Sequence, residues 1–207
     1  MFRLDGEGQP GSCDVSDACD QLGIEAVRTG ALRPLWPECP PLSGRLTTVR
    51  LEPPAAGTPL PELLEALADA PDRLVLVDLG GRIDVQCWGT VLATAARYFG
   101  VRGALVNGCA RDVEGLRELD LPTYARGVHP ATMRGRLEVV AVGEPVDLDG
   151  SVVEPDSFAV ADASGIVFLP SDRVDEVFPL AAELRAREEE RLRAIVDGAD
   201  PRSVLGS

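Results

Sequence analysis

One segment of the chain alternates apolar runs and turns in a way that few folds can accommodate. Residues 74–77 form an apolar run, Gly80 and Gly81 follow, residues 91–99 place apolar side chains at helical spacing, and residues 104–106 form a second apolar run. A strand, a helix and a strand in this order are typical of a sheet covered by helices. The sequence therefore predicts an α/β fold.

The flanking segments extend this unit on both sides. We expect a short helix over residues 15–22, with Ser16 as its N-cap and Gly23 just past its end. Pro179 is expected to kink the last helix or to start it afresh. Further strands are expected over residues 45–51, 137–142, 151–153, 158–161 and 166–169, and further helices over residues 60–67, 112–119 and 174–195.

The length of 207 residues favours a single compact unit with an appended terminal element. We expect a flexible arm over residues 1–14, because this stretch is polar and glycine-rich. An α/β domain is expected over residues 15–172. A C-terminal helical tail is expected over residues 173–207.

The charge of the chain argues against several kinds of partner. The 20 basic and 34 acidic residues give a formal net charge of -14, which repels nucleic acid and anionic membrane surfaces. No apolar run reaches the roughly 18 residues that a membrane helix needs, and the first residues lack the basic head and apolar core of a signal peptide. We expect a cytoplasmic protein that binds neither nucleic acid nor membrane.

Cysteine and histidine offer little for catalysis. The five cysteines are odd in number and show no CxxC spacing, so we interpret them as small buried thiols rather than as a disulfide framework or a zinc site. The single histidine, His129, lies in a loop-like setting, and we expect a surface or structural role for it, outside the mechanism. The cysteines stand at positions 13, 19, 39, 87 and 109.

The segment Asn-Gly-Cys-Ala-Arg-Asp over residues 107–112 leads from a predicted strand into a predicted helix. Ligands of α/β folds bind at the carboxyl ends of strands, where helix N-termini point their N–H groups outward. Arg111 can hold a carboxylate through two parallel hydrogen bonds, and Asp112 can bind a hard divalent cation. Alternatively, Asp112 caps the helix beside a surface arginine.

A second turn, Trp88-Gly89-Thr90-Val91-Leu92, begins the helix of the central unit. Unpaired amides at a helix start can receive a carboxylate or a developing enolate oxygen. We expect this turn and the Arg111 turn to lie at the same edge of one sheet. The alternative is that the glycines only allow the chain to turn.

The tail carries a carboxylate on an apolar stripe. Glu188 stands on the face formed by Val177, Ala181, Leu184, Leu192 and Ile195. A carboxylate on a packing face needs a partner. Glu188 can pair with an arginine of a neighbouring subunit, or it can reach into a neighbour's site.

In combination, these motifs resemble those of the RraA-like family, which includes the 4-hydroxy-4-methyl-2-oxoglutarate / 4-carboxy-4-hydroxy-2-oxoadipate aldolases. The resemblance implies a swivelling-type α/β/β/α sandwich, assembly into homotrimers or homohexamers, and active sites at subunit interfaces. It covers nearly the whole chain and rests on residues 15–18, 88–93, 100–106, 110–112, 161–167 and 188–190.

The resemblance also implies a site and a reaction. Asp112 and water molecules would bind Mg²⁺ or Mn²⁺, and Glu188 of another subunit would lie near the metal. Arg111 and the amides of Val91 and Leu92, in the turn that begins at Gly89, would hold the pyruvate part of a small anionic 2-oxo acid. The implied activity is that of a metal-dependent carbon–carbon lyase, an aldolase or an oxaloacetate-type decarboxylase, which works through a pyruvate enolate.

Three positions depart from the aldolase pattern. Thr90 stands at a catalytic position where the aldolases carry an acidic residue, Asn107 stands where they usually have Asp, and Pro155-Asp156-Ser157 replaces the usual Pro-Gly-Asp. A threonine hydroxyl can bind a water on the metal, but it brings no charge. Thr90 therefore leaves room for a different substrate, metal dependence or reaction.

Two alternatives to the aldolase interpretation remain open. One is a repurposed family member that acts on another oxo acid or enolisable substrate in a specialised pathway. The other is a non-catalytic protein that regulates RNA degradation through protein contacts. Such regulators lack the Asp of the Arg-Asp pair, so Asp112 favours an enzyme.

Overall fold

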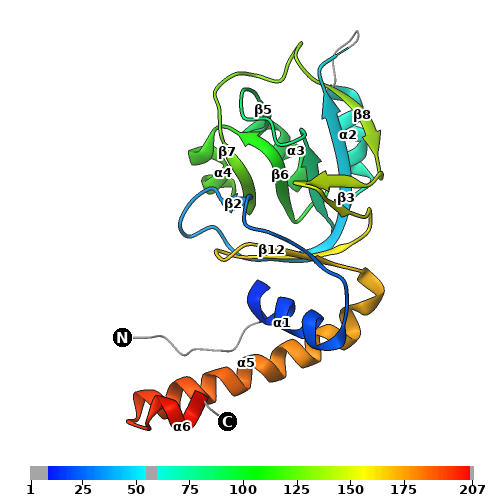
Figure 1. Ribbon diagram of the computed structural model, residues 1–207. Coiled ribbons are helices and arrows are strands. Elements are labelled where there is room, and N and C mark those ends of the chain that lie inside the picture. The colour runs from blue at the N-terminus through cyan, green and yellow to red at the C-terminus, as the bar shows by residue number, and fades with distance from the viewer. Residues whose placement is uncertain (1–8, 55–59, 206–207) are drawn as a thin grey trace.

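The computed structural model describes residues 9–54 and 60–205, as a mixed α/β body from which a long C-terminal helix extends (Figure 1). Its helices are α1 (Ser12–Leu22), α2 (Leu60–Ala68), α3 (Thr90–Tyr98), α4 (Val113–Leu119), α5 (Val174–Val196) and α6 (Pro201–Leu205), with a 3₁₀ turn η1 (Ser171–Arg173) before α5. Its strands are β1 (Val27–Thr29), β2 (Arg33–Pro34), β3 (Leu42–Glu52), β4 (Leu74–Asp78), β5 (Gln86–Trp88), β6 (Gly103–Ala110), β7 (Thr123–Val128), β8 (Glu138–Val142), β9 (Val146–Leu148), β10 (Ser151–Val153), β11 (Phe158–Ala161) and β12 (Ile166–Leu169).

Parallel strands form the centre of the main sheet, in the order β3, β4, β6, β7. Antiparallel strands extend both sides, with β11, β12 and β1 beyond β3 and with β2 beyond β7. The short strand β5 pairs in parallel with the carboxyl end of β6. The sheet curls into a half-barrel, and β9 and β10 form a separate hairpin.

Alternating side chains of the central strands enter two different cores. Val75, Val77 and Val106 pack with helices α2, α3 and α4 on one face. Leu74 and Leu105 pack on the other face, with the β9–β10 hairpin and β12. Because both faces are covered, the central strands are continuous apolar runs rather than alternating ones.

A third core joins the two ends of the described chain. Val15 and Cys19 of α1 pack with Val177 and Ala181 of α5, and both helices cover the outside of β11 and β12. Figure 1 shows α1 beside α5 below the sheet, while the rest of α5 and α6 extend past α1. The expected C-terminal helix is present as α5. Its first half packs in this layer, and its second half extends beyond it.

The start of α1 and the course of α5 correct two predictions. Ser16 as an N-cap is wrong, because α1 begins at Ser12 after Gly11. The Asp14 carboxylate accepts a hydrogen bond from the Gly11 amide at 2.8 Å, which stabilises this earlier start. A fresh helix at Pro179 is also wrong, since α5 continues through this residue. Burial of the apolar side chains on either side offsets the one hydrogen bond that proline removes.

The structure also bears on the predictions for the cysteines and for membrane helices, but it does not test the division into domains. All five cysteines are free, but Cys13 is exposed and Cys39 is half-buried, so the interpretation as buried thiols holds for three of them. The division into arm, domain and tail stays a prediction, and residues 1–8 of the arm lie outside the described residues. Among the described helices, none is long and apolar enough to cross a membrane.

Candidate functional site

Two strand-to-helix turns meet at one edge of the sheet. Trp88 at the end of β5 lies opposite Ala110 at the end of β6, and the Arg111 amide donates a hydrogen bond to the Trp88 carbonyl at 2.9 Å. The turn into α3 and the turn into α4 are therefore neighbours. This confirms the expectation that both lie at the same edge.

A small pocket of about 50 Å³ opens where these turns meet. It brings together five residues that the sequence singled out, namely Gly89, Val91, Leu92, Arg111 and Asp112. Its remaining lining comes from Gln86, Thr132, Met133 and Arg134. Arginine, aspartate and a helix N-terminus thus converge on one small space.

Gly89 allows this convergence because it has no side chain. Its backbone is extended, and a Cβ there would lie 3.0 Å from Cγ of Arg111 and 3.1 Å from Oδ2 of Asp112. The first backbone bond of α3 runs from the Ala93 amide to the Gly89 carbonyl, so the amides of residues 90–92 have no partner inside the helix. A larger residue would push the arginine and the aspartate away from these amides.

The Arg111 and Asp112 side chains lie against each other, with Nε 3.4 Å from Oδ2. The Arg111 Nε is nevertheless buried without a hydrogen-bond partner in the described part of the chain. Asp112 has a left-handed backbone (φ 57°) and makes no side-chain capping bond to α4. Its carboxylate, 45% exposed, is therefore available to a ligand rather than used as a helix cap.

Thr90 lies at the start of α3 and contacts the start of α4. Its hydroxyl lies 3.5 Å from the Asp112 carbonyl, and its side chain packs against Gly115 of α4. Thr90 is not among the residues that line the pocket. Its catalytic role stays a prediction.

Glu188 lies on another part of the molecule. It is exposed on α5, above a hollow of about 410 Å³ that Asp14 and Asp17 of α1 also line. This hollow shares no lining residue with the Arg111 pocket. Within one chain the structure does not bring Glu188 to Asp112, so its predicted role requires a second copy and stays a prediction.

His129 has a local structural contact. Its Nδ1 accepts a hydrogen bond from the Ala131 amide at 3.1 Å, and its own amide donates to the Ala110 carbonyl at 2.9 Å. These bonds hold the loop that carries Thr132, Met133 and Arg134 against the pocket. They agree with a structural role rather than a catalytic one.

The thiols beside the pocket are poorly suited to act as nucleophiles. Burial raises the pKa of the Cys87 thiol, and neighbouring Cys109 and Asp78 raise it further. Burial likewise raises the pKa of Cys109, with Asp84 as a second cause. Because the thiolate is the reactive form, neither side chain supplies one near neutral pH.

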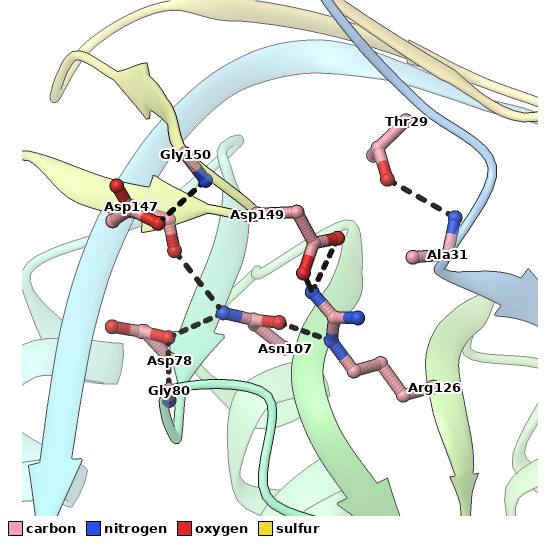
Figure 2. Close-up of polar contacts among 9 residues, drawn as sticks. All are labelled: Thr29, Ala31, Asp78, Gly80, Asn107, Arg126, Asp147, Asp149 and Gly150. Carbon is pink, nitrogen blue, oxygen red and sulfur yellow. Dashed lines mark hydrogen bonds and ion pairs between the residues drawn. The ribbon is translucent and has the colours of Figure 1, made fainter.

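Asn107 belongs to a buried polar network on the Leu105 side of β6 (Figure 2). Its amide donates to Asp78 Oδ1 at 2.6 Å, and its Oδ1 accepts from the Nε of Arg126 at 2.5 Å. Arg126 in turn pairs with both oxygens of Asp149 at 2.8 Å. An aspartate at position 107 could not donate to Asp78, so the amide suits this network.

The donors at the pocket suit a loosely held metal ion. In the described ranges, no group of three or more His, Cys, Asp and Glu side chains could hold a metal. Asp112 offers a single exposed carboxylate. Mg²⁺ is commonly bound by one or two carboxylates together with water and substrate oxygens, and one carboxylate at an open pocket fits that pattern.

The sequence analysis missed four residues of the pocket. Gln86 is nearly fully buried in the three-residue strand β5, which is too short to show a periodic pattern. Thr132, Met133 and Arg134 lie in a loop that reaches the site through a bond from the Gln86 amide to the Ala131 carbonyl at 3.0 Å. Such a long-range contact leaves no local signal in the sequence.

Together, the fold and the pocket define an α/β domain in which an arginine, an aspartate and the unpaired amides of a helix start lie in one small space. Comparison with known proteins identifies the family: the chain belongs to the RraA-like family, whose Aldolase/RraA model matches residues 12–168. The predicted family is therefore confirmed.

Two relatives illustrate the range of the family. The chain is 28% identical to protein DlpA of Legionella pneumophila over 91% of its length, but it spans only 31% of that protein. It is 27% identical to a protein of Halalkalibacterium halodurans named "Putative 4-hydroxy-4-methyl-2-oxoglutarate aldolase", with 91% of this chain and 85% of that protein covered.

Two solved structures share the fold. An uncharacterized protein from Pseudomonas syringae pv. tomato matches 95% of this chain and 89% of its own length with a TM-score of 0.85 and 25% identity. Streptomyces coelicolor RraAS2, described as an unusual member of the RNase ES inhibitor RraA protein family, matches 90% of this chain and 92% of its own length with a TM-score of 0.75 and 25% identity. The predicted fold class is confirmed.

Proposed function

We propose that this chain is a carbon–carbon lyase that cleaves a small 2-oxo acid and stabilises the resulting pyruvate enolate. The observation that carries the proposal is the meeting of Arg111, Asp112 and the α3 amides in one pocket. Membership of a family with relatives named as aldolases supports a lyase, while the structural match to RraAS2 keeps a regulatory protein as the competing class.

Each group in the pocket has a task in such a reaction. The Arg111 guanidinium would hold the substrate carboxylate, and the Val91 and Leu92 amides would stabilise negative charge that develops on the 2-oxo oxygen. Asp112 is the one carboxylate among the lining residues, and it would position a water that accepts a substrate proton. Arg134, exposed at the rim, would attract a second anionic group.

Asp112 would also be the residue that holds Mg²⁺ or Mn²⁺. When bound, a divalent ion supplies Lewis-acid stabilisation of an enolate. An amine-based route is closed to the side chains of this chain, because none of its 207 residues is lysine and a Schiff base requires a lysine amine. Electrostatic stabilisation is the route that remains.

A partner subunit would complete the site. Val91 lines the pocket and is 67% exposed, and Ile83 and Val128 nearby in the fold are 64% and 58% exposed. Apolar side chains around a polar pocket are suited to contact with another copy of the chain. This supports the proposed homotrimer or homohexamer.

The test is pyruvate release from 4-hydroxy-4-methyl-2-oxoglutarate and from oxaloacetate, with Mg²⁺, with Mn²⁺ and with chelator. We expect metal-dependent release that falls about 100-fold or more in kcat/KM for Arg111→Ala and for Asp112→Asn. The matched control is the exposed ion pair of Asp200 and Arg202, where Arg202→Ala and Asp200→Asn should leave release unchanged. If no pyruvate is released with Mg²⁺ or with Mn²⁺, the lyase proposal is refuted and a protein-binding regulator is favoured.

A further inference from the structure

Gln86 carries an acceptor that the described part of the chain leaves without a partner. The residue is 3% exposed, and its Oε1 is buried with no hydrogen bond. It also lines the pocket that contains Arg111 and Asp112. A buried polar atom without a partner is uncommon in native proteins and asks for an explanation.

The backbone around Gln86 is fixed from two directions. Gln86 lies opposite Cys109 in the parallel pairing of β5 with β6. Its amide donates to the Ala131 carbonyl at 3.0 Å, which ties β5 to the loop on the far side of the pocket. Gln86 thus borders the pocket from a strand whose backbone is held on both sides, rather than from a loop.

The pocket contains a second polar atom without a hydrogen bond, and it is of the opposite kind. The Nε of Arg111 is a donor without a hydrogen-bond partner, whereas Oε1 of Gln86 is an acceptor. A carboxylate can satisfy Arg111, but an ionised carboxylate only accepts hydrogen bonds and leaves Gln86 unpaired. A ligand that satisfies both atoms directly would therefore bring a donor as well as a carboxylate.

We propose that Gln86 is a specificity-determining residue that accepts a hydrogen bond from a hydroxyl group of the substrate. This inference rests on the proposed function and narrows it to 2-oxo acids that carry a hydroxyl group. Oxaloacetate in its keto form brings two carboxylates and no hydroxyl. A 4-hydroxy-2-oxo acid brings both a carboxylate for Arg111 and an O–H for Gln86.

The contact suits aldol cleavage. In that step the bond between C3 and C4 breaks, its electron pair forms the enolate, the hydroxyl proton passes to a base, and the C4–O bond becomes a carbonyl. An amide oxygen is too weak a base to take this proton, so Gln86 orients the hydroxyl while another group removes the proton. A site built for a hydroxyl discriminates against analogues that lack it.

The first arm of the test compares the two substrates. Gln86→Met keeps the length of the side chain and removes the acceptor, and Gln9→Met, on an exposed residue outside the pocket, is the matched control. We expect Gln86→Met to lower kcat/KM for 4-hydroxy-4-methyl-2-oxoglutarate by about 10- to 100-fold, mainly through KM, and to leave oxaloacetate near the wild-type value. Equal losses on both substrates, or no loss on either, would overturn the proposal.

The second arm needs no turnover. Malate and succinate differ by one hydroxyl, and we expect malate to raise the melting temperature of the wild type more than succinate does. Gln86→Met should abolish this difference. It should also raise the melting temperature of the ligand-free protein, because it removes a buried acceptor without a partner; a lowered value would indicate a structural role and count against the proposal.

The two arms separate the failure of this inference from the failure of the proposed function. Pyruvate release without any selectivity at Gln86 overturns the inference alone. A malate preference that depends on Gln86, in a protein that releases no pyruvate, overturns the lyase and leaves the hydroxyl site in place. No release and no preference for malate overturn both.

Discussion

At the scale of single residues, Asp162 connects the start of the chain to the sheet. Its carboxylate accepts hydrogen bonds from the Ser12 amide at 2.7 Å, the Ser12 hydroxyl at 2.8 Å and the Ser164 amide at 2.8 Å. Burial raises the pKa of Asp162, but the hydrogen bonds from Ser12, Ser164 and Gly165 outweigh burial and hold this pKa below its ordinary value. The first turn of α1 is thus anchored to the β11–β12 turn.

This contact predicts a pH-dependent stability. Because the folded-state pKa of Asp162 is lowered, its contribution is present above the unfolded pKa of about 3.9 and is lost as the pH falls through the folded pKa. We expect Asp162→Asn to lower the free energy of unfolding by about 1–2 kcal/mol at pH 7. Urea unfolding at a series of pH values should show the difference from wild type shrinking below about pH 4.

The control for this prediction is Asp69→Asn, at an exposed aspartate just after α2. Its unfolding curve should match the wild type at each pH. A difference between Asp162→Asn and the wild type that persists unchanged at low pH would contradict the role given to the ionised carboxylate.

At the scale of elements, α3 and α4 touch at a glycine. A Cβ on Gly115 would lie 2.4 Å from Oγ1 of Thr90 and 3.2 Å from its Cγ2. Inside a helix, alanine is ordinarily favoured over glycine by about 1 kcal/mol. Here the clash opposes this preference, so the two helix starts are fitted to each other.

The prediction is that Gly115→Ala destabilises the protein and that Thr90→Ala reverses the effect. We expect Gly115→Ala alone to cost about 1–3 kcal/mol, the usual range for overpacking, and the double variant to recover most of it. Chemical denaturation of the wild type, both single variants and the double variant gives the coupling energy between the two positions. Additive effects would mean that these two side chains do not meet.

The same scale shows which elements the sequence could reveal. The apolar runs of β4 and β6 and the amphipathic pattern of α3 predicted the centre of the fold, since each follows a clear period. The strands β1, β2, β5 and β9, which have two or three residues each, were not predicted, although β10, which also has three residues, was. β7 escaped because Arg126 and Gly127 interrupt its apolar run.

The residues of the pocket show the same difference between long periodic elements and short or irregular ones. Arg111, Asp112 and the Gly89 turn were predictable because they sit at the ends of periodic elements. Gln86 was hidden in β5, and Arg134 in a loop that only tertiary contacts bring to the pocket. The sequence also could not show that the Asp112 side chain makes no capping bond, because an aspartate before a helix can either cap the helix or bind a ligand.

At the scale of the whole molecule, the prediction for Glu188 concerns assembly. Leu192 and Val196, in the part of α5 beyond α1, are 45% and 68% exposed, so this part of the helix presents apolar surface beside the glutamate. If Glu188 serves the Asp112 site of a neighbour, each complete site needs both residues from different subunits. Oligomers made only of Asp112→Ala or only of Glu188→Ala would then be inactive. Oligomers that combine subunits of both variants would be active.

Co-expression of these two variants, with the whole unselected mixture of oligomers assayed, is the measurement. Random mixing of equal amounts should restore about a quarter of the wild-type pyruvate release, because one site in four combines two intact residues in a heterologous interface. Asp112→Ala mixed with Arg111→Ala is the control and should restore nothing, since both residues belong to one subunit's pocket. Full activity of Glu188→Ala alone would refute the shared site.

The packing of α1 against α5 also bears on how this fold can be combined with others. Figure 1 shows the first helix, α1, and the last two, α5 and α6, together below the sheet, away from the β5–α3 and β6–α4 turns. A neighbouring domain joined before α1 or after α6 would be attached on this helical side and would leave the pocket open. The same domain can thus serve as a module of a larger polypeptide, as the match to about a third of DlpA illustrates.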